Sequence, residues 1–211
     1  MNPVKIVIGF APTIAFSLLA PWIGVALAAV AGMIVAVGVV IATRGPGSGW
    51  GRFKMLPVAQ TVILALLAGI ALAAHNAGVD GVLADYGRGL VSLALAAVIL
   101  VTVPFAPFTA QFARESVPAQ YWNSPRFVGM NRRLSLIWGG AVLAVAVGHL
   151  AAAALNSSGH GGRPVVLTFE WVLPVVAVLL AIRATTRIVA AAQERAGNAT
   201  ARASREARPG K

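Results

Sequence analysis

Long apolar runs separated by short polar segments make up most of the sequence. The runs cover residues 4–42, 56–74, 90–109, 134–155 and 165–182. A helix that crosses about 30 Å of hydrocarbon needs about 20 mostly apolar residues. Each of the last four runs approaches or matches that length, so the pattern predicts transmembrane helices rather than the short core helices of a soluble protein.

The first run is too long for one crossing, because a helix over residues 4–42 would extend about 58 Å. It contains Pro21 and Trp22, and proline favours the first turn of a helix while tryptophan favours the membrane interface. We therefore divide the run into spans 4–19 and 22–42, which gives six spans in total. Pro12 lies inside the first span, so a half-crossing or a tilted helix remains open there.

Composition supports the same interpretation. Hydrophobic residues make up 58% of the 211 residues and charged residues only 11%, whereas a soluble domain carries about a quarter charged residues. So few charges do not cover a water-facing surface of this size. The sequence therefore predicts an all-α fold, a polytopic integral membrane helical bundle.

The positive charges predict the orientation of the bundle. The formal net charge is +11, and Lys and Arg accumulate in the cytoplasmic loops of membrane proteins. If both termini are cytoplasmic, 15 of the 17 basic residues lie inside, and only Arg88 and Arg163 lie outside. Because the basic residues alternate with apolar runs, anionic lipid headgroups are the expected partners, and nucleic acid is not. An Arg-rich, Ala-rich composition is typical of GC-rich bacteria, which indicates a multi-pass protein of the bacterial plasma (inner) membrane.

The C-terminal segment 193–211 differs from the spans. Its sequence, QERAGNATARASREARPGK, is polar and basic and has no apolar periodicity. Such segments do not bury enough apolar surface to offset the entropy of ordering. We expect a disordered cytoplasmic tail that serves as a topology anchor, and the alternative is that its arginines lie on anionic lipid.

Polar and aromatic residues gather in one internal segment, residues 104–127, in PFAPFTAQFARESVPAQYWNSPRF. Phe108 and Phe112 are four residues apart, which suits a short amphipathic helix in the membrane interface. This helix belongs to an expected cytoplasmic loop, 110–131. Ser124 and Pro125 form a helix-start signal, with Ser as N-cap and Pro at the first helical position, and predict a continuous helix from there to Leu155.

This loop is also the best candidate for contact with a partner. One interpretation is an anchor that organises spans four and five. A second is a docking surface for a cytoplasmic or membrane partner, such as another envelope membrane protein. A third is a catalytic or gating role, for which Glu115 would be the only carboxylate of the segment. The residues that would form the docking surface are Phe112, Arg114, Glu115, Tyr121, Trp122 and Arg126.

Ionisable groups inside a membrane are costly and often mark pathways. His149 and Glu170 lie near the outer ends of their spans and are the candidate pathway residues for a transporter or channel. His75 and His160 fall on the same side, and Asp85 is expected to pair with Arg88. The sequence contains no recognisable catalytic or metal-binding motif, so we expect neither an enzyme nor a cofactor nor a metal site.

Small residues four positions apart allow membrane helices to approach closely. Three such ladders predict helix contacts. They are Gly24, Ala28, Gly32 and Ala36; Ala65, Gly69 and Ala73; and Gly140, Ala144 and Gly148.

Several short motifs resemble the intracellular septation protein A family, small bacterial inner-membrane proteins of five or six spans. They are FAPTIAF at residues 10–16, His75-Asn76, and the series Glu115, Pro118, Trp122, Asn131 and Trp138. The resemblance implies a non-enzymatic role in envelope maintenance, with partners from the elongation or division machinery. A scaffold of this kind is the first functional hypothesis, and a small-molecule or ion transporter or channel is the alternative.

Overall fold

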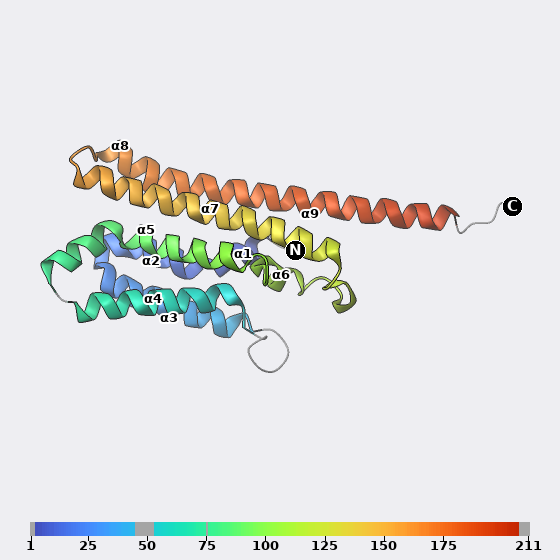
Figure 1. Cartoon of the computed structure of the whole chain (residues 1–211), viewed down its shortest axis with the longest axis horizontal. Coiled ribbons are helices and arrows are strands. Elements are labelled where there is room, and N and C mark those ends of the chain that lie inside the picture. Colours follow the sequence, from blue (N-terminus) through green and yellow to red (C-terminus); the bar gives the residue numbers. More distant parts are fainter. Residues whose placement is uncertain (1–2, 45–52, 75, 207–211) are drawn as a thin grey trace.

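The computed structural model describes residues 3–44, 53–74 and 76–206, and within these ranges it is a helical bundle without strands (Figure 1). Five of these helices are long and apolar enough to cross a membrane, and α2 is a shorter apolar helix. The predicted all-α bundle is therefore confirmed. The elements are α1 (Pro3–Gly9), α2 (Ala11–Ile23), α3 (Val25–Ala42), α4 (Met55–Ala73), α5 (Ala77–Thr102), α6 (Phe108–Ala113), the 3₁₀ turn η2 (Ala119–Tyr121), α7 (Pro125–Ser157), α8 (Arg163–Val166), the π-helix η3 (Leu167–Val172) and α9 (Leu173–Glu206).

The long helices run up and down the bundle. The chain begins at the end where α6 lies, and α1 and α2 carry it to the opposite end (Figure 1). From there α3, α4, α5, α7 and α9 alternate in direction, and α9 brings the described chain back to the end where it started. The main packing pairs are α2 with α3, α3 with α4, α5 with α7 and α7 with α9.

The breaks in the first apolar run differ from the predicted ones. The chain does not break before Trp22, because α2 continues through Pro21 to Ile23. It breaks instead at Gly24, whose φ of 79° favours glycine. A second break at Phe10 separates α1 from α2, so the expected span 4–19 consists of two helical pieces.

Gln60 of α4 bridges the break at Phe10. Its Nε2 donates to the carbonyl of Gly9 at 2.6 Å, and its Oε1 accepts from the backbone N–H of Thr13 at 3.1 Å and from the Thr13 hydroxyl at 2.7 Å. An uninterrupted helix would join Gly9 and Thr13 directly. The amide of Gln60, which is 1% exposed, therefore takes the place of a missing backbone hydrogen bond.

The fourth span was predicted over 90–109, and both of its ends are wrong. The helix α5 begins at Ala77, because Asn76 caps it by accepting from the N–H of Val79 at 3.0 Å. Asp80 in the first turn also favours a helix start there. The helix ends at Thr102, before the Pro104–Pro107 segment. By contrast, α7 begins at Pro125, directly after its N-cap residue Ser124, as predicted, and it is 33 residues long.

The C-terminal segment also differs from its prediction. The helix α9 continues to Glu206, so residues 193–206 are helical rather than disordered. Alanine, arginine, glutamate and glutamine are strong helix formers, and this propensity outweighs the lack of apolar periodicity. The rest of the predicted tail, residues 207–211, lies outside the described residues.

The basic end holds an aromatic core. Phe10 stacks on Trp138 with ring centroids 5.5 Å apart, and it meets the edge of Phe108, which in turn meets Phe112. All four side chains are buried. The short helix α6 that carries Phe108 and Phe112 is thus packed into the protein core, so its two aromatic side chains contact protein and not lipid, contrary to the amphipathic surface helix that was predicted.

Only one of the three small-residue ladders faces a neighbour throughout most of its length. In α3, Ala28, Gly32 and Ala36 are buried, and a Cβ on Gly32 would meet Leu64, Phe16 and the carbonyl of Pro12 at 3.0–3.1 Å. The ladder on α4 is exposed at Ala65, Gly69 and Ala73, and on α7 only Gly148 is buried.

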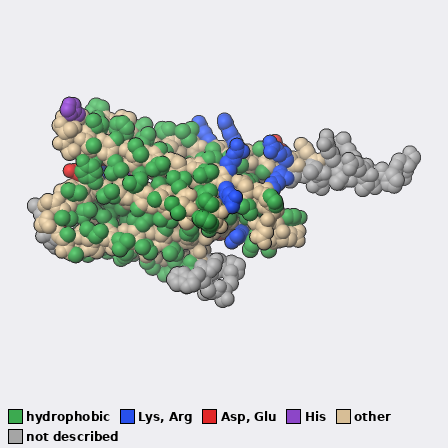
Figure 2. All heavy atoms as spheres, viewed as in Figure 1, with side chains coloured by type: hydrophobic (Ala, Val, Ile, Leu, Met, Phe, Trp, Pro, Cys, Tyr) green, Lys and Arg blue, Asp and Glu red, His purple; other side chains and the backbone are tan. Residues whose placement is uncertain are grey.

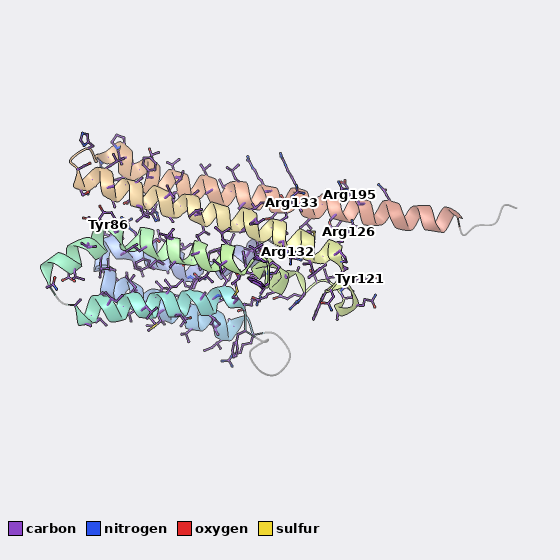
Figure 3. The ribbon with its side chains drawn as sticks, viewed as in Figure 1. Tyr86, Tyr121, Arg126, Arg132, Arg133 and Arg195 are labelled. Carbon is purple, nitrogen blue, oxygen red and sulfur yellow. The ribbon has the colours of Figure 1, made fainter. Side chains whose placement is uncertain are left out.

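Lys and Arg side chains gather toward one end of the bundle (Figure 2). This basic end is the one where α1 begins, α6 lies and α9 leaves the bundle. The labelled arginines Arg126, Arg132, Arg133 and Arg195 all lie there, whereas Tyr86 lies toward the opposite end (Figure 3). The charge asymmetry predicted from the sequence is therefore present in three dimensions.

Candidate functional site

The opposite half of the bundle contains a cluster of three ionisable side chains. Arg88 of α5 makes two hydrogen bonds to Glu170 of η3, from Nη1 to Oε2 at 2.9 Å and from Nη2 to Oε1 at 2.7 Å. The two side chains are only 14% and 15% exposed. His149 of α7 is 6% exposed and lies near both residues. Three helices thus each contribute one member of this charged cluster.

Two glycines allow these helices to approach so closely. A Cβ on Gly89, beside Arg88, would lie 2.6 Å from Leu150 of α7. A Cβ on Gly148, beside His149, would lie 2.3 Å from Leu173 and 3.3 Å from the carbonyl of Phe169. Because glycine has no side chain, the helices can pack closely at these two positions. This close packing brings the neighbouring residues Arg88 and His149 near the adjacent helices.

The backbone around Glu170 is unusual. Leu167–Val172 forms a π-helix between α8 and α9, a rare conformation that occurs frequently at functional sites. The wider turn presents both Glu170 and Trp171 to the space between α2, α5, α7 and α9. It is a second, independent sign that this region is specialised.

Those helices enclose a pocket of about 350 Å³, within the range of small-molecule sites. His149, Glu170 and Ser92 lie at its polar end, and Phe10, Leu95 and Trp138 close the end toward the aromatic core. Apolar residues line most of the remaining wall, among them Ile14, Leu18, Val142, Val145, Val175, Val178 and Leu179.

The structure brings together both candidate pathway residues, His149 and Glu170. It also adds Arg88, which was expected to pair with Asp85 at the surface; this expectation is wrong. Arg88 could have been assigned to a helix of membrane-spanning length only if the cap of α5 at Asn76 had been identified. The pocket has an apolar wall and a closed floor, so its geometry suits binding of an apolar molecule better than passage of an ion.

The basic end is held together by a second ionic cluster. Glu115 bonds the Nζ of Lys5 at 2.6 Å and the Nζ of Lys54 at 2.5 Å. Gln111 accepts from the backbone N–H of Met55 at 2.7 Å and so caps α4, and Lys54 lies 4.3 Å from the ring centre of Phe112. These contacts fasten α6 and the following turn to the starts of α1 and α4.

The candidate docking residues therefore have different roles in the structure. Phe112 is buried and Glu115 binds two lysines, so both stabilise the fold. Arg114 lies over the ring of Trp122 at 5.1 Å, and Trp122 Nε1 donates to the carbonyl of Val117. The outward-facing members of the set are Tyr121, which is 52% exposed, and Arg126, which is exposed and donates to the carbonyl of Ala192 of α9 at 3.0 Å.

The ionic cluster at the basic end should make stability depend on pH. Burial alone would raise the pKa of Glu115, but hydrogen bonds and charge interactions with Lys5 and Lys54 lower it overall. A lowered folded pKa stabilises the protein above the unfolded pKa, about 4.3 for glutamate, and this stabilisation is lost as the pH falls through the folded value. We expect Glu115→Gln to lower the Tm at pH 7 slightly and to reduce the fall in Tm between pH 7 and pH 3.

The matched control is Glu194→Gln, which alters an exposed carboxylate on α9. It should leave the pH dependence of the wild type unchanged. An equally steep acid decrease in Glu115→Gln and wild type would contradict the assigned role of Glu115.

Comparisons with family models, curated proteins and solved structures return no match for this chain. Among residues 3–44, 53–74 and 76–206, no three His, Asp or Glu side chains form a group that could hold a metal ion. His75, which contributes to the resemblance, lies outside the described residues. The fold and side-chain geometry are therefore the basis for the functional argument.

Proposed function

We propose that the protein is a non-enzymatic multi-pass protein of the bacterial inner membrane, with its basic end and both termini in the cytoplasm. In this proposal it is a scaffold that docks another envelope membrane protein of the elongation or division machinery. The observation that supports a docking role is the extension of α9 beyond the rest of the bundle.

The contact from Arg126 to the carbonyl of Ala192 places that part of α9 beside the start of α7. Beyond it, residues 193–206 continue as helix and add about 21 Å at about 1.5 Å per residue. Residues 193–195 and 197–198 are exposed. A helix that leaves its own bundle in this way presents a surface to another molecule.

The charge of this end indicates what kind of surface it would contact. The exposed arginines Arg126, Arg132, Arg133 and Arg195 lie at it (Figure 3). Such a surface attracts anionic lipid headgroups, at about 1 kcal/mol for each basic residue near the membrane. It also complements an acidic cytoplasmic face on a membrane partner. Tyr121 supplies an exposed aromatic side chain at the same end.

The resemblance to the septation protein family agrees with this proposal. Several residues that carry it have structural partners at the basic half of the bundle. Phe10 stacks on Trp138, Glu115 binds Lys5 and Lys54, and Asn131 is fully buried. They would build the platform from which α9 and the loop with Tyr121 are presented.

A small-molecule transporter is the second candidate, and the meeting of His149 and Glu170 beside a pocket favours it. The closed floor of the pocket at Phe10, Leu95 and Trp138 argues against an open route through the bundle. For this reason the scaffold remains the preferred function.

Photocrosslinking in cells tests the scaffold. A photoreactive amino acid at Tyr121 or Glu194 should trap the same membrane-associated protein, and Arg195→Glu should greatly reduce both adducts by opposing an acidic partner surface. Tyr86, the other tyrosine of the chain and one near the opposite end, is the matched control position. Recovery of lipid adducts alone, or of self-adducts alone, would count against a scaffold.

A further inference from the structure

We propose that a pocket at the basic end binds the phosphate group of an anionic phospholipid between Arg114 and Arg132. The pocket has a volume of about 230 Å³ and lies between the segment that follows α5, the helix α6 and the start of α7. Such a site rests on the proposed location of this end at the membrane surface, but it does not require a scaffold partner.

Two guanidinium groups from different segments line this pocket, Arg114 at the end of α6 and Arg132 on α7. No Asp or Glu is among the lining residues, and within the described part of the chain neither arginine forms an ion pair. The neighbouring Glu115 is bound to Lys5 and Lys54 instead. Because like charges repel each other, an anion between the two guanidinium groups would be stabilised.

Other contacts hold both guanidinium groups at the pocket. Nη2 of Arg132 donates to the carbonyl of Pro104 at 2.6 Å, which leaves further N–H groups of the guanidinium as donors. Arg114 lies 5.1 Å from the ring centre of Trp122, and Nε1 of Trp122 donates to the carbonyl of Val117 at 2.8 Å. Side chains that are already ordered lose less conformational entropy when they bind a ligand.

Neutral donors and an apolar wall complete the pocket. The Oε1 of Gln111 accepts from the N–H of Met55, which leaves the amide nitrogen of Gln111 as a donor, and Asn123 supplies a second amide. Ala110 and Phe127 also line the pocket and are buried members of one apolar cluster. Guanidinium and amide N–H donors without an acidic neighbour suit the oxygens of a phosphate group.

Exposed apolar side chains beside the pocket indicate that this phosphate belongs to a lipid. Phe105 lines the pocket and is 87% exposed, and Val101, four residues earlier, is 69% exposed. On α7, Leu136 lies four residues after Arg132 and is 52% exposed. The helix α5 is long and apolar enough to cross a membrane and ends at Thr102. A phospholipid would therefore place its acyl chains on these side chains and its phosphate in the pocket.

Native mass spectrometry of the full-length protein in an uncharged detergent tests this site. The probes are phosphatidylglycerol and phosphatidylcholine with identical acyl chains, which differ in net charge. We expect one phosphatidylglycerol to bind each protein at about tenfold lower concentration than phosphatidylcholine, because the guanidinium groups attract the anion and repel the choline cation.

Two double variants of equal charge test the location of the site. Arg114→Gln/Arg132→Gln should reduce the preference for phosphatidylglycerol to less than about threefold, because both charge-assisted contacts are lost. Arg183→Gln/Arg187→Gln removes two positive charges from exposed positions on α9 that do not line the pocket. This control should retain the preference of the wild type.

Two single variants test the two parts of the lipid separately. In Arg114→Glu the new carboxylate would pair with Arg132 and take the place of the phosphate, so the preference should disappear while the helical content measured by circular dichroism stays that of the wild type. Phe105→Ser removes apolar surface and should weaken the binding of both lipids about three- to tenfold, with the preference for phosphatidylglycerol unchanged.

Equal binding of the two lipids by the wild type would overturn the proposal. A preference for phosphatidylglycerol that persists in a folded Arg114→Glu variant would overturn the role of the arginines, and an equal loss in both double variants would show general charge attraction and overturn the pocket. Displacement of the lipid by an equal concentration of glycerol 3-phosphate would assign the pocket to a soluble phosphate ester and overturn the lipid. These results are separate from the crosslinks at Tyr121, which decide the scaffold.

Discussion

Replacing Gln60 with leucine is expected to destabilise the protein by about 2–4 kcal/mol, because a buried and a partly buried backbone group lose their partner. The carbonyl of Gly9 and the N–H of Thr13 both bond to the Gln60 amide at the break between α1 and α2. Leucine has a similar volume, so the loss reflects hydrogen bonding rather than a cavity. The measurement is the free energy of unfolding in mixed micelles, titrated with denaturing detergent.

Thr61→Val is the matched control for Gln60→Leu. Thr61 is the next residue on α4, and its hydroxyl bonds only to the carbonyl of Pro57 in its own helix. The control should alter the free energy of unfolding by less than about 0.5 kcal/mol. A Gln60→Leu variant as stable as this control would show that the break does not depend on the amide.

Removing one partner of the Arg88–Glu170 pair is expected to have an effect of similar or larger size. Arg88→Leu leaves a buried carboxylate without its counter-charge, which typically costs about 3–5 kcal/mol. The double variant Arg88→Leu/Glu170→Leu removes both charges, and we expect it to regain most of that loss. The free energies of unfolding of the two single variants and the double variant form a double-mutant cycle that measures this coupling.

Arg133→Gln controls for the loss of one positive charge, because Arg133 is exposed at the basic end. Its stability should remain close to that of the wild type. If Arg88→Leu and Arg133→Gln were equally stable, the Arg88–Glu170 contact would contribute little. A double variant less stable than both singles would contradict the expected compensation.

Local sequence signals located some element starts accurately and missed others. Ser124-Pro125 predicted the start of α7 because the cap and the first helical residue are adjacent in sequence and need no tertiary contact. Asn76 is an equally good cap for α5, but apolar length was the criterion for the fourth span, and residues 77–89 are too polar to meet it. The break at Gly24 also has a local cause, because glycine readily adopts the positive φ found there. The prediction used Pro21 instead and therefore placed the break too early.

The role of the inner segment could not be predicted from its composition. Aromatic residues near a membrane span favour the interface, and Phe112 and Trp122 both fit that expectation. Whether they contact lipid or protein depends on how α6 packs, and here Phe112 is buried while Trp122 bonds to Val117 within the loop. The same limit applies to the small-residue ladders, because a ladder indicates that close approach is possible but not which side of the helix meets a neighbour.

The sequence by itself determined that this chain is an all-α, apolar bundle with a basic end, because hydrophobic length and charge are properties of each segment alone. It also identified His149 and Glu170 as unusual, since ionisable groups inside apolar runs are costly wherever they lie. Only the tertiary structure decided that these residues meet Arg88 beside a pocket. It also decided that Gln60 replaces the backbone hydrogen bond that is missing at Phe10, and that Glu115 binds both Lys5 and Lys54. Each of these contacts joins residues from different helices, and its distance depends on how closely those helices pack, which no single segment encodes.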